Sequence, residues 1–269
     1  MNFKQKFNIV NDVQYEEQII MNDSASKAPA VGRAFAILDL LSNSAAPLGI
    51  SDIVRQLGLA KSTTHGLIHT LLTEGAIRQE GGGYRLDARA LAWARGFSLQ
   101  NDKVASFLRL TASEPELDGE TAMLSVLDGD HVLYLATRPG NKPLAVNFKA
   151  GGRIPLHCTA SGKAMLACTP DSGLASRLES LALTPMTPRS LSSKTALLDN
   201  LRHARAQGYA EDDEEAAQGL LCIGAAVLDA DGQPQAGVAV SVVKATVDAP
   251  RRQALQQAIM RLASKLSAQ

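Results

Sequence analysis

The pattern of hydrophobic and polar positions between residues 31 and 72 has the period of an α-helix and is interrupted twice. One apolar stripe ends before Pro47, a second ends at Gly58, and a third starts at about Lys61. Residues three or four apart share a helix face, so each stripe predicts a short helix with one buried side. The apolar faces of the first two helices consist of Ala34, Leu38, Leu41, Ile53, Val54 and Leu57. We expect Ser51 to cap the second helix. Two short helices joined by a Gly-containing turn predict a helix-turn-helix.

The third helix has two contrasting halves when its residues are placed 100° apart from Ser62 onward. One half is mainly apolar and consists of Thr64, Leu67, Ile68, Leu71 and Leu72. The other half is polar and consists of Ser62, His65, Gly66, His69 and Thr70. A solvated helix face usually carries pairs of Glu and Lys, whereas this face has no acid before Glu74. Small hydrogen-bonding side chains and imidazoles allow close approach to a DNA groove, so we predict a DNA-reading helix. A polar helix in a protein-binding domain is the weaker alternative.

The stretch "AIRQEGGGYRL" predicts a β-hairpin with its turn at Gly81–Gly83. A helix-turn-helix followed by such a hairpin is a winged helix.

A long helical pattern follows from Asp87, and we interpret it as a connector to a second domain. For Leu91, Trp93 and Phe97 in this connector we expect a role in dimer formation. Packing of Trp93 on its own winged helix is an equal alternative.

Hairpins and helices alternate in the remaining sequence. Hairpins are expected around Asp128–Asp130 and around Asp231–Gly232, and the C-terminal stretch "APRRQALQQAIMRLASKLSAQ" predicts an amphipathic helix. Antiparallel hairpins with helices on one side are typical of an α+β domain of the GAF or profilin-like kind. The predicted organisation is a disordered tail (1–28), a winged helix-turn-helix DNA-binding domain (29–90), a connector helix (91–112) and an effector-binding domain (113–269).

Composition and charge narrow the classes of function. The chain has 269 residues, of which 45% are hydrophobic, and carries 27 acidic and 27 basic side chains. Residues 26–95 carry eight bases against five acids, a net charge of +3 that suits a DNA-binding segment. The three cysteines have no CxxC spacing, which argues against a disulfide framework or a zinc site. No run resembles a signal peptide or a membrane span, so we expect a cytoplasmic protein. We also expect neither a cofactor nor a bound metal.

Five ordered motifs carry a resemblance to a known family. They are "KSTTHGLIHTL", "GETAMLSVLDGDHVLYL", "IPLHCTASGKAMLA", "GYAEDDEE" and "LLCIGAAVLDADGQ". With the winged-helix pattern, they resemble the IclR family of bacterial transcriptional regulators from about Val31 to the C-terminus. The resemblance implies a DNA-binding homodimer, often a dimer of dimers, whose C-terminal domain binds a small organic effector. It also implies control of a catabolic operon, and we expect a repressor.

One position departs from the family pattern within the predicted DNA-reading face. Family members commonly carry Arg, the commonest bidentate reader of guanine, where this chain has Gly66. We therefore expect neighbouring side chains and the wing to supply the base and phosphate contacts. The predicted DNA-binding residues are Arg33, Lys61, Ser62, Thr63, His65, His69 and Arg78.

The resemblance also implies an effector site, formed by Ala160, Ser161, Gly162, Asp212, Leu220, Cys222, Ala239 and Ser241. The residues themselves support it, since the two-residue period of a strand puts Leu220 and Cys222 on one face, and likewise Ala239 and Ser241. A two-residue loop at Asp231–Gly232 would place Cys222 opposite Ser241, and a longer loop would shift that register.

The chemistry of this site favours a small carboxylic acid as effector. Ser161 and Gly162 open a helix, so their backbone N–H groups are expected to hold a carboxylate. We expect Asp212 to accept a hydrogen bond from a ligand hydroxyl or aldehyde hydrate. Family members that bind small acids often have a second serine where this chain has Ala239, so a larger or partly apolar acid fits here.

Enzyme chemistry is the remaining alternative, together with a ligand-binding protein-interaction module. The "SGKA" stretch lacks the upstream glycine and the Ser/Thr of a phosphate loop. His157 and Cys158 are neighbours, and on a strand they would point to opposite faces, which makes a poor nucleophile–base pair. The acidic run Glu211–Glu215 lacks the alternating ligands of a calcium loop, so we interpret it as solvated surface plus one pocket carboxylate.

Overall fold

The computed structural model describes residues 27–142 and 148–269, so the tail predicted over residues 1–28 lies almost entirely outside the described residues. The chain forms two compact units, and the boundary between them in the sequence lies between Gln100 and Asn101. Among the described residues, no helix combines the length and apolar character needed to cross a membrane.

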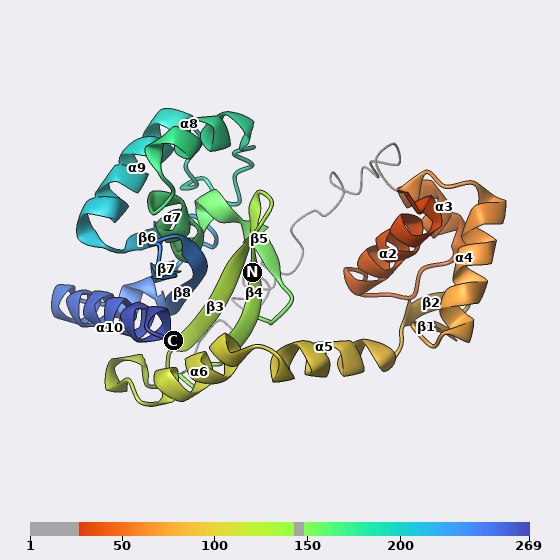
Figure 1. Ribbon diagram of the computed structural model, residues 1–269, viewed down its shortest axis with the longest axis horizontal. Helices are drawn as coiled ribbons and strands as arrows, with labels where there is room; N and C mark the ends of the chain where they lie inside the picture. Colours follow the sequence, from red (N-terminus) through yellow and green to blue (C-terminus); the bar gives the residue numbers. More distant parts are fainter. Residues whose placement is uncertain (1–26, 143–147) are drawn as a thin grey trace. The chain divides into compact units, whose positions relative to one another are not determined.

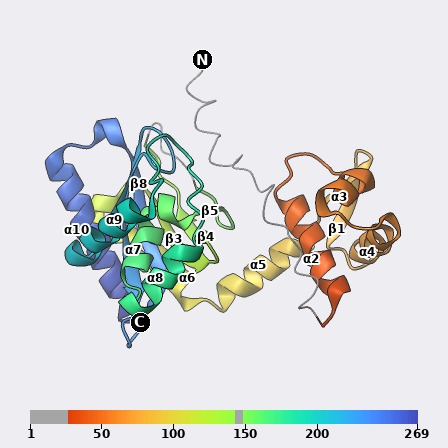
Figure 2. The same cartoon turned by 90° about the horizontal axis from the view of Figure 1, so that it is seen from above.

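The N-terminal unit is a winged helix. Its elements are α2 (Pro29–Ser42), α3 (Ile50–Leu57), α4 (Lys61–Thr73), β1 (Ile77–Glu80), β2 (Gly83–Leu86) and α5 (Arg89–Leu99). Figure 1 and Figure 2 show α2, α3 and α4 side by side. One buried cluster joins them, with Ile53 and Ile68 contributed by the predicted apolar faces. From α2 the fully buried residue is Ile37, which lies beside the predicted stripe, whereas Ala34 and Leu38 are only half-buried. The predicted helix-turn-helix and hairpin are confirmed.

The helix-turn-helix turn is made at Gly58, which ends α3 in the left-handed conformation with φ of 64°. Only glycine adopts this conformation without steric cost. The expected cap at Ser51 is wrong: α3 starts one residue earlier, and the carbonyl of Gly49 accepts the first helical hydrogen bonds, from Asp52 and Ile53.

The predicted connector helix is divided into two helices. α5 ends at Leu99, and α6 (Asp102–Ala112) starts after Asn101, whose side chain accepts a hydrogen bond from the Val104 N–H group at 3.2 Å. Asn101 has extended backbone angles, so it caps α6 and does not continue α5. An asparagine that captures a backbone N–H group in this way competes with an unbroken helix.

The C-terminal unit is an α+β domain built on one antiparallel sheet (Figure 1). Its strands are β3 (Thr121–Asp128), β4 (His131–Arg138), β5 (Arg153–Pro155), β6 (Ala210–Asp213), β7 (Leu220–Leu228) and β8 (Pro234–Val243), and its longer helices are α6, α7 (Ala160–Ala167), α8 (Asp171–Ser180), α9 (Lys194–Gln207) and α10 (Ala249–Ser267). Short 3-10 turns lie at Pro115–Leu117, Leu156–Cys158 and Lys244–Thr246. The strand order is β5-β4-β3-β8-β7-β6.

Each face of this sheet has its own core. On one face, Met123, Tyr134 and Ala239 pack with residues of α7, α8 and α9. On the other face, Leu124 and Val238 pack with residues of α6 and α10. Neighbouring strand residues alternate between the two cores because successive side chains of a strand point to opposite faces. The helices thus lie on both faces, which corrects the expectation of helices on one side.

The helix α7 lies unusually close to the sheet at two glycines. A β-carbon on Gly224 would lie 2.6 Å from the Ser161 nitrogen, and one on Gly237 would lie 2.9 Å from the Ser161 β-carbon. Every residue of α7 is buried. The missing side chains on β7 and β8 therefore set the distance between the first turn of α7 and the strands.

Candidate DNA-reading helix and effector site

The exposed and buried sides of α4 divide along the predicted line. Thr64, Ile68 and Leu71 are buried, whereas Ser62, His65, Gly66, His69 and Thr70 are exposed and Thr63 is half-buried. The Thr64 and Thr70 hydroxyls donate to backbone carbonyls one turn back, those of Ala60 and Gly66. The outward face of α4 therefore offers the Ser62 hydroxyl and two imidazoles.

The predicted basic contacts occupy different parts of the winged helix. Lys61 is exposed at the start of α4, and Arg33 is half-buried on α2. Arg78 lies on β1, where its guanidinium is paired with Glu80 at 2.6 Å. Lys61 therefore lies closest to the reading face, while the charge of Arg78 is partly compensated within the wing.

The aromatic connector helix α5 presents its apolar residues to the exterior. Trp93 is 51% exposed, and Leu91, Phe97 and Leu99 are also exposed. The Arg89 guanidinium lies 5.8 Å from the centre of the Trp93 ring. In the described residues Trp93 is therefore not buried against its own winged helix, which was one of the two alternatives.

Three of the predicted effector residues form one row across the sheet. Asp212 of β6 pairs with Cys222 of β7, which pairs with Ser241 of β8. Directly opposed residues point to the same face, so the three side chains lie side by side. Ser241 Oγ is buried without a hydrogen-bond partner among the described residues. A buried hydroxyl without a partner is costly, and a ligand oxygen would satisfy it.

The predicted pairing of Cys222 with Ser241 is found, but the loop differs from the one that predicted it. The hairpin loop runs from Asp229 to Gln233 and is closed by a hydrogen bond between the two, from N–H to carbonyl, at 2.9 Å. An irregularity between Val227 and Leu228 takes up the difference in register. A β-bulge of this kind restores the pairing that the longer loop would have shifted.

The N-terminus of α7 is less open to a ligand than expected. The Gly162 N–H group donates to Thr159 Oγ1 at 3.1 Å, so Thr159 caps the helix. The Ser161 hydroxyl accepts a hydrogen bond from Ser125 Oγ at 2.9 Å. The expectation that the Gly162 N–H group is available to a carboxylate is therefore wrong, because an N-cap side chain already satisfies it.

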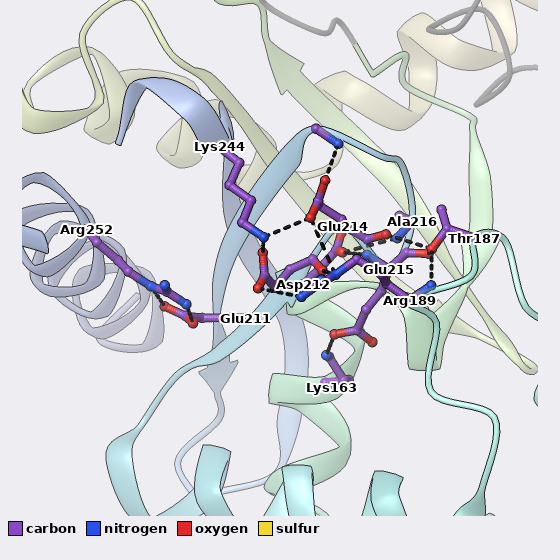
Figure 3. A network of polar contacts seen from close by, with 12 residues as sticks. Lys163, Thr187, Arg189, Glu211, Asp212, Glu214, Glu215, Ala216, Lys244 and Arg252 are labelled. Atoms are coloured by element: carbon purple, nitrogen blue, oxygen red, sulfur yellow. Dashed lines mark hydrogen bonds and ion pairs between the residues drawn. The ribbon is translucent and has the colours of Figure 1, made fainter. Parts of the chain in front are cut away.

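Asp212 is held by the backbone that follows it. Its Oδ1 atom accepts hydrogen bonds from the N–H groups of Glu215 at 2.6 Å and Ala216 at 3.1 Å (Figure 3). Burial raises the pKa of this carboxyl to about 7, against the opposing influence of Lys163. Asp212 therefore carries a proton for much of the time near neutral pH, which lowers its repulsion of an anion.

A buried ion pair that sequence reasoning missed lies beside Asp212. Lys163 of α7 is fully buried, and its ammonium group binds the carboxylate of Glu215 (Figure 3). Glu215 Oε2 is buried without a partner among the described residues. The interpretation of Glu211–Glu215 as solvated surface plus one pocket carboxylate is thus wrong for Glu215. Two side chains of this run, those of Asp212 and Glu215, are buried.

The segment after Asp212 is clamped by charged contacts. Glu214 has a left-handed backbone with φ of 68°, a strained conformation for a residue other than glycine. Its side chain accepts a hydrogen bond from the Gly219 N–H group and one from Lys244, both at 2.8 Å. Glu211 is paired with Arg252 of α10. These contacts hold the backbone that positions Asp212 and Glu215.

His157 and Cys158 lie in a 3-10 turn, so their side chains are not on opposite faces as a strand would have them. Cys158 Sγ lies 3.3 Å from His157 Nε2. Burial raises the pKa of the Cys158 thiol to about 11 and lowers the pKa of His157 to about 4. Both groups are neutral near pH 7, whereas nucleophilic catalysis by cysteine needs a thiolate.

Comparisons with known proteins agree with this architecture. The IclR helix-turn-helix domain matches residues 30–81, and the domain described as bacterial transcriptional regulator IclR C-terminal matches residues 108–268. The HTH-type transcriptional regulator XynR of Escherichia coli is 35% identical over 245 residues, which cover 88% of this chain and 96% of XynR.

Two solved structures share the fold. The repressor BlcR of Agrobacterium tumefaciens is 32% identical, with a TM-score of 0.58 over 90% of this chain and 97% of BlcR. An IclR homologue from Microbacterium hydrocarbonoxydans, complexed with 4-hydroxybenzoate, has a TM-score of 0.71 at 21% identity over 89% of this chain and 100% of that one.

A helix-turn-helix domain followed by an α+β domain of this kind defines a DNA-binding bacterial transcriptional regulator. The chain belongs to the IclR family. Members of this family are transcriptional regulators and not enzymes, which decides against the enzyme alternative.

Proposed function

We propose that this regulator is a repressor that binds its operator through the polar face of α4 and responds to a small organic acid. The observation that carries the DNA-binding mode is the exposed, acid-free surface of Ser62, His65 and His69 on a helix whose opposite side is buried. Hydroxyls and imidazoles at these positions can read base edges in the major groove.

The proposed effector occupies the α7 face of the sheet beside the row Asp212, Cys222 and Ser241. The unpartnered Ser241 hydroxyl is a donor for an anionic oxygen. Protonated Asp212 adds a second donor and removes a negative charge from the site. Leu220 and Ala239 make the remaining wall apolar. A hydroxy or keto acid with an apolar portion matches these features, and the homologue complexed with 4-hydroxybenzoate supports this ligand class.

The proposed assembly is a homodimer joined at least in part through α5. The exposed side chains of Leu91, Trp93, Phe97 and Leu99 lie within one helix of 11 residues. Trp93 and Phe97 are four residues apart and share one side of the helix, and a second copy of α5 would cover that side.

Gel-shift titration with DNA from upstream of the chain's own gene tests the DNA-binding mode. His65→Ala is expected to weaken binding by about 1–3 kcal/mol, the size of a lost base contact. Thr73→Ala is the matched control, since its hydroxyl donates to the His69 carbonyl of its own helix. Equal affinity of the two variants, with unchanged melting temperatures, would contradict the assignment.

The proposed dimer is tested by sedimentation of the Trp93→Ala variant, which is expected to dimerise more weakly than the wild type.

A further inference from the structure

The wing of the helix-turn-helix domain contains a cluster of four charged residues, Arg78, Glu80, Arg85 and Asp87. Arg78 of β1 lies directly opposite Arg85 of β2. Opposed residues of an antiparallel pair point to the same side, and Glu80 shares that side because it lies two residues after Arg78. The Asp87 carboxylate lies 3.9 Å from the Arg78 guanidinium, so two cations and two anions are present together.

One carboxylate engages both arginines. Glu80 Oε2 accepts hydrogen bonds from Arg78 Nη2 at 2.6 Å and from Arg78 Nε at 3.1 Å. Glu80 Oε1 lies 3.6 Å from Arg85 Nε, and Arg85 Nη2 also donates to the Ala45 carbonyl at 2.6 Å. The arrangement resembles two arginines around the oxygens of a phosphate, which arginine binds with the same fork geometry as a carboxylate.

The cluster is rigidly attached to the reading helix. β1 starts four residues after the end of α4, and the Ala76 N–H group donates to the Leu71 carbonyl at 2.9 Å. All four charged side chains are exposed or half-exposed, between 36% and 49%. Pairs exposed to this degree exchange partners at little cost. A phosphate of bound DNA can therefore replace Glu80.

We infer that Glu80 is an internal competitor of the DNA backbone, which holds Arg78 and Arg85 in the free protein and restricts their binding to phosphates. The inference rests on the proposed DNA-binding mode. Non-specific affinity comes almost entirely from phosphate contacts, whereas specific affinity adds base contacts. A carboxylate that competes for the wing arginines therefore removes a larger share of the free energy of binding to unrelated DNA than of the free energy of binding to the operator.

The test is the salt dependence of binding by Glu80→Gln to a mixed-sequence duplex of about 30 base pairs, three helical turns. The slope of log affinity against log salt is expected to steepen by about 1 to 2 units, since each released arginine that neutralises a phosphate contributes about 0.9. Affinity at physiological salt is expected to rise by up to about fivefold beyond that of the control.

The matched control is Glu74→Gln, which removes the same charge from the same domain. Arg89, the partner of Glu74, lies outside the wing hairpin on α5, with its guanidinium over the Trp93 ring. A second variant, Arg78→Gln in the Glu80→Gln background, is expected to reverse about half of the gain in slope.

The outcomes separate the inference from the function on which it rests. A steeper slope for Glu80→Gln than for Glu74→Gln supports it. Equal slopes for the two variants show that only net charge matters and overturn the inference alone. A wild-type protein that binds no duplex overturns the DNA-binding mode and the inference with it.

Discussion

The ammonium group of Lys163 binds the carboxylate of Glu215 inside the C-terminal domain, where the two side chains are 0% and 8% exposed. The pair joins α7 to the segment after β6, and it lies next to the Asp212 carboxyl (Figure 3). Removal of one partner from a buried pair leaves an uncompensated charge, which is more costly than removal of both.

Lys163→Met is therefore expected to lower the free energy of unfolding by about 3–5 kcal/mol. The measurement is urea unfolding followed by circular dichroism. The double variant Lys163→Met/Glu215→Leu is the control, and it is expected to recover much of the loss because it leaves no buried charge from the pair. A double variant no more stable than Lys163→Met would contradict an ion pair at this place.

The glycine in the middle of α4 gives a second prediction. A β-carbon at Gly66 would meet no other atom within 4 Å, and the backbone there is helical. Gly66→Ala is expected to raise the unfolding free energy by about 0.5–1 kcal/mol, since glycine loses the most backbone entropy in a helix. Reduced operator affinity of the stabilised variant would indicate that DNA approaches this backbone closely, and thermal unfolding with gel-shift assays measures both quantities.

The buried carboxyl of Asp212 gives a pH-dependent prediction. Its pKa in the folded protein, about 7, lies above its ordinary value of 3.8, so the native state binds this proton more tightly than the unfolded state. The stabilisation is complete below pH 3.8 and is lost as pH rises through the range from 3.8 to about 7.

Asp212→Asn should remove this loss, because the amide oxygen can still accept the Glu215 and Ala216 hydrogen bonds. The stability of the variant relative to the wild type is expected to rise between about pH 4 and pH 7 and to level off above pH 7. Since the low pKa of His157 is common to both proteins, the difference isolates Asp212. A difference that stays constant across this range would show that Asp212 does not titrate there.

Effector binding gives the fourth prediction. Ser241→Ala removes the unpartnered hydroxyl of the row and is expected to reduce affinity for a bound acid by about 1–2 kcal/mol, while binding of effector-free protein to DNA stays close to native. Calorimetry with a panel of hydroxy, keto and aromatic acids, 4-hydroxybenzoate among them, measures it. Cys222→Leu, which adds volume in the same row, should weaken the larger acids most. An acid whose affinity is indifferent to both changes would place the site elsewhere.

The sequence predicted those parts of the molecule that depend on local periodicity. The two sides of α4 follow from the 3.6-residue period, and the shared face of Cys222 and Leu220 follows from the period of a strand. The prediction that Cys222 pairs with Ser241 depended on the length of the β7–β8 loop. The loop is longer than the one assumed, and the pairing is found only because a β-bulge compensates for the extra length. The Lys163–Glu215 pair joins residues 52 positions apart, and no local pattern marks the glutamate of an acidic run that turns inward. The break between α5 and α6 at Asn101 was not predicted, because the sequence on both sides of it has a helical pattern.

Gly224 and Gly237 fix the first turn of α7 against the sheet with no space for even a methyl group. At that distance no side chain fits between the first turn of α7 and strands β7 and β8. In the proposed effector site, selectivity for size would therefore depend on the strand side chains at positions 222, 239 and 241. Redesign of the proposed site for a different acid should therefore vary those three positions and leave the two glycines unchanged.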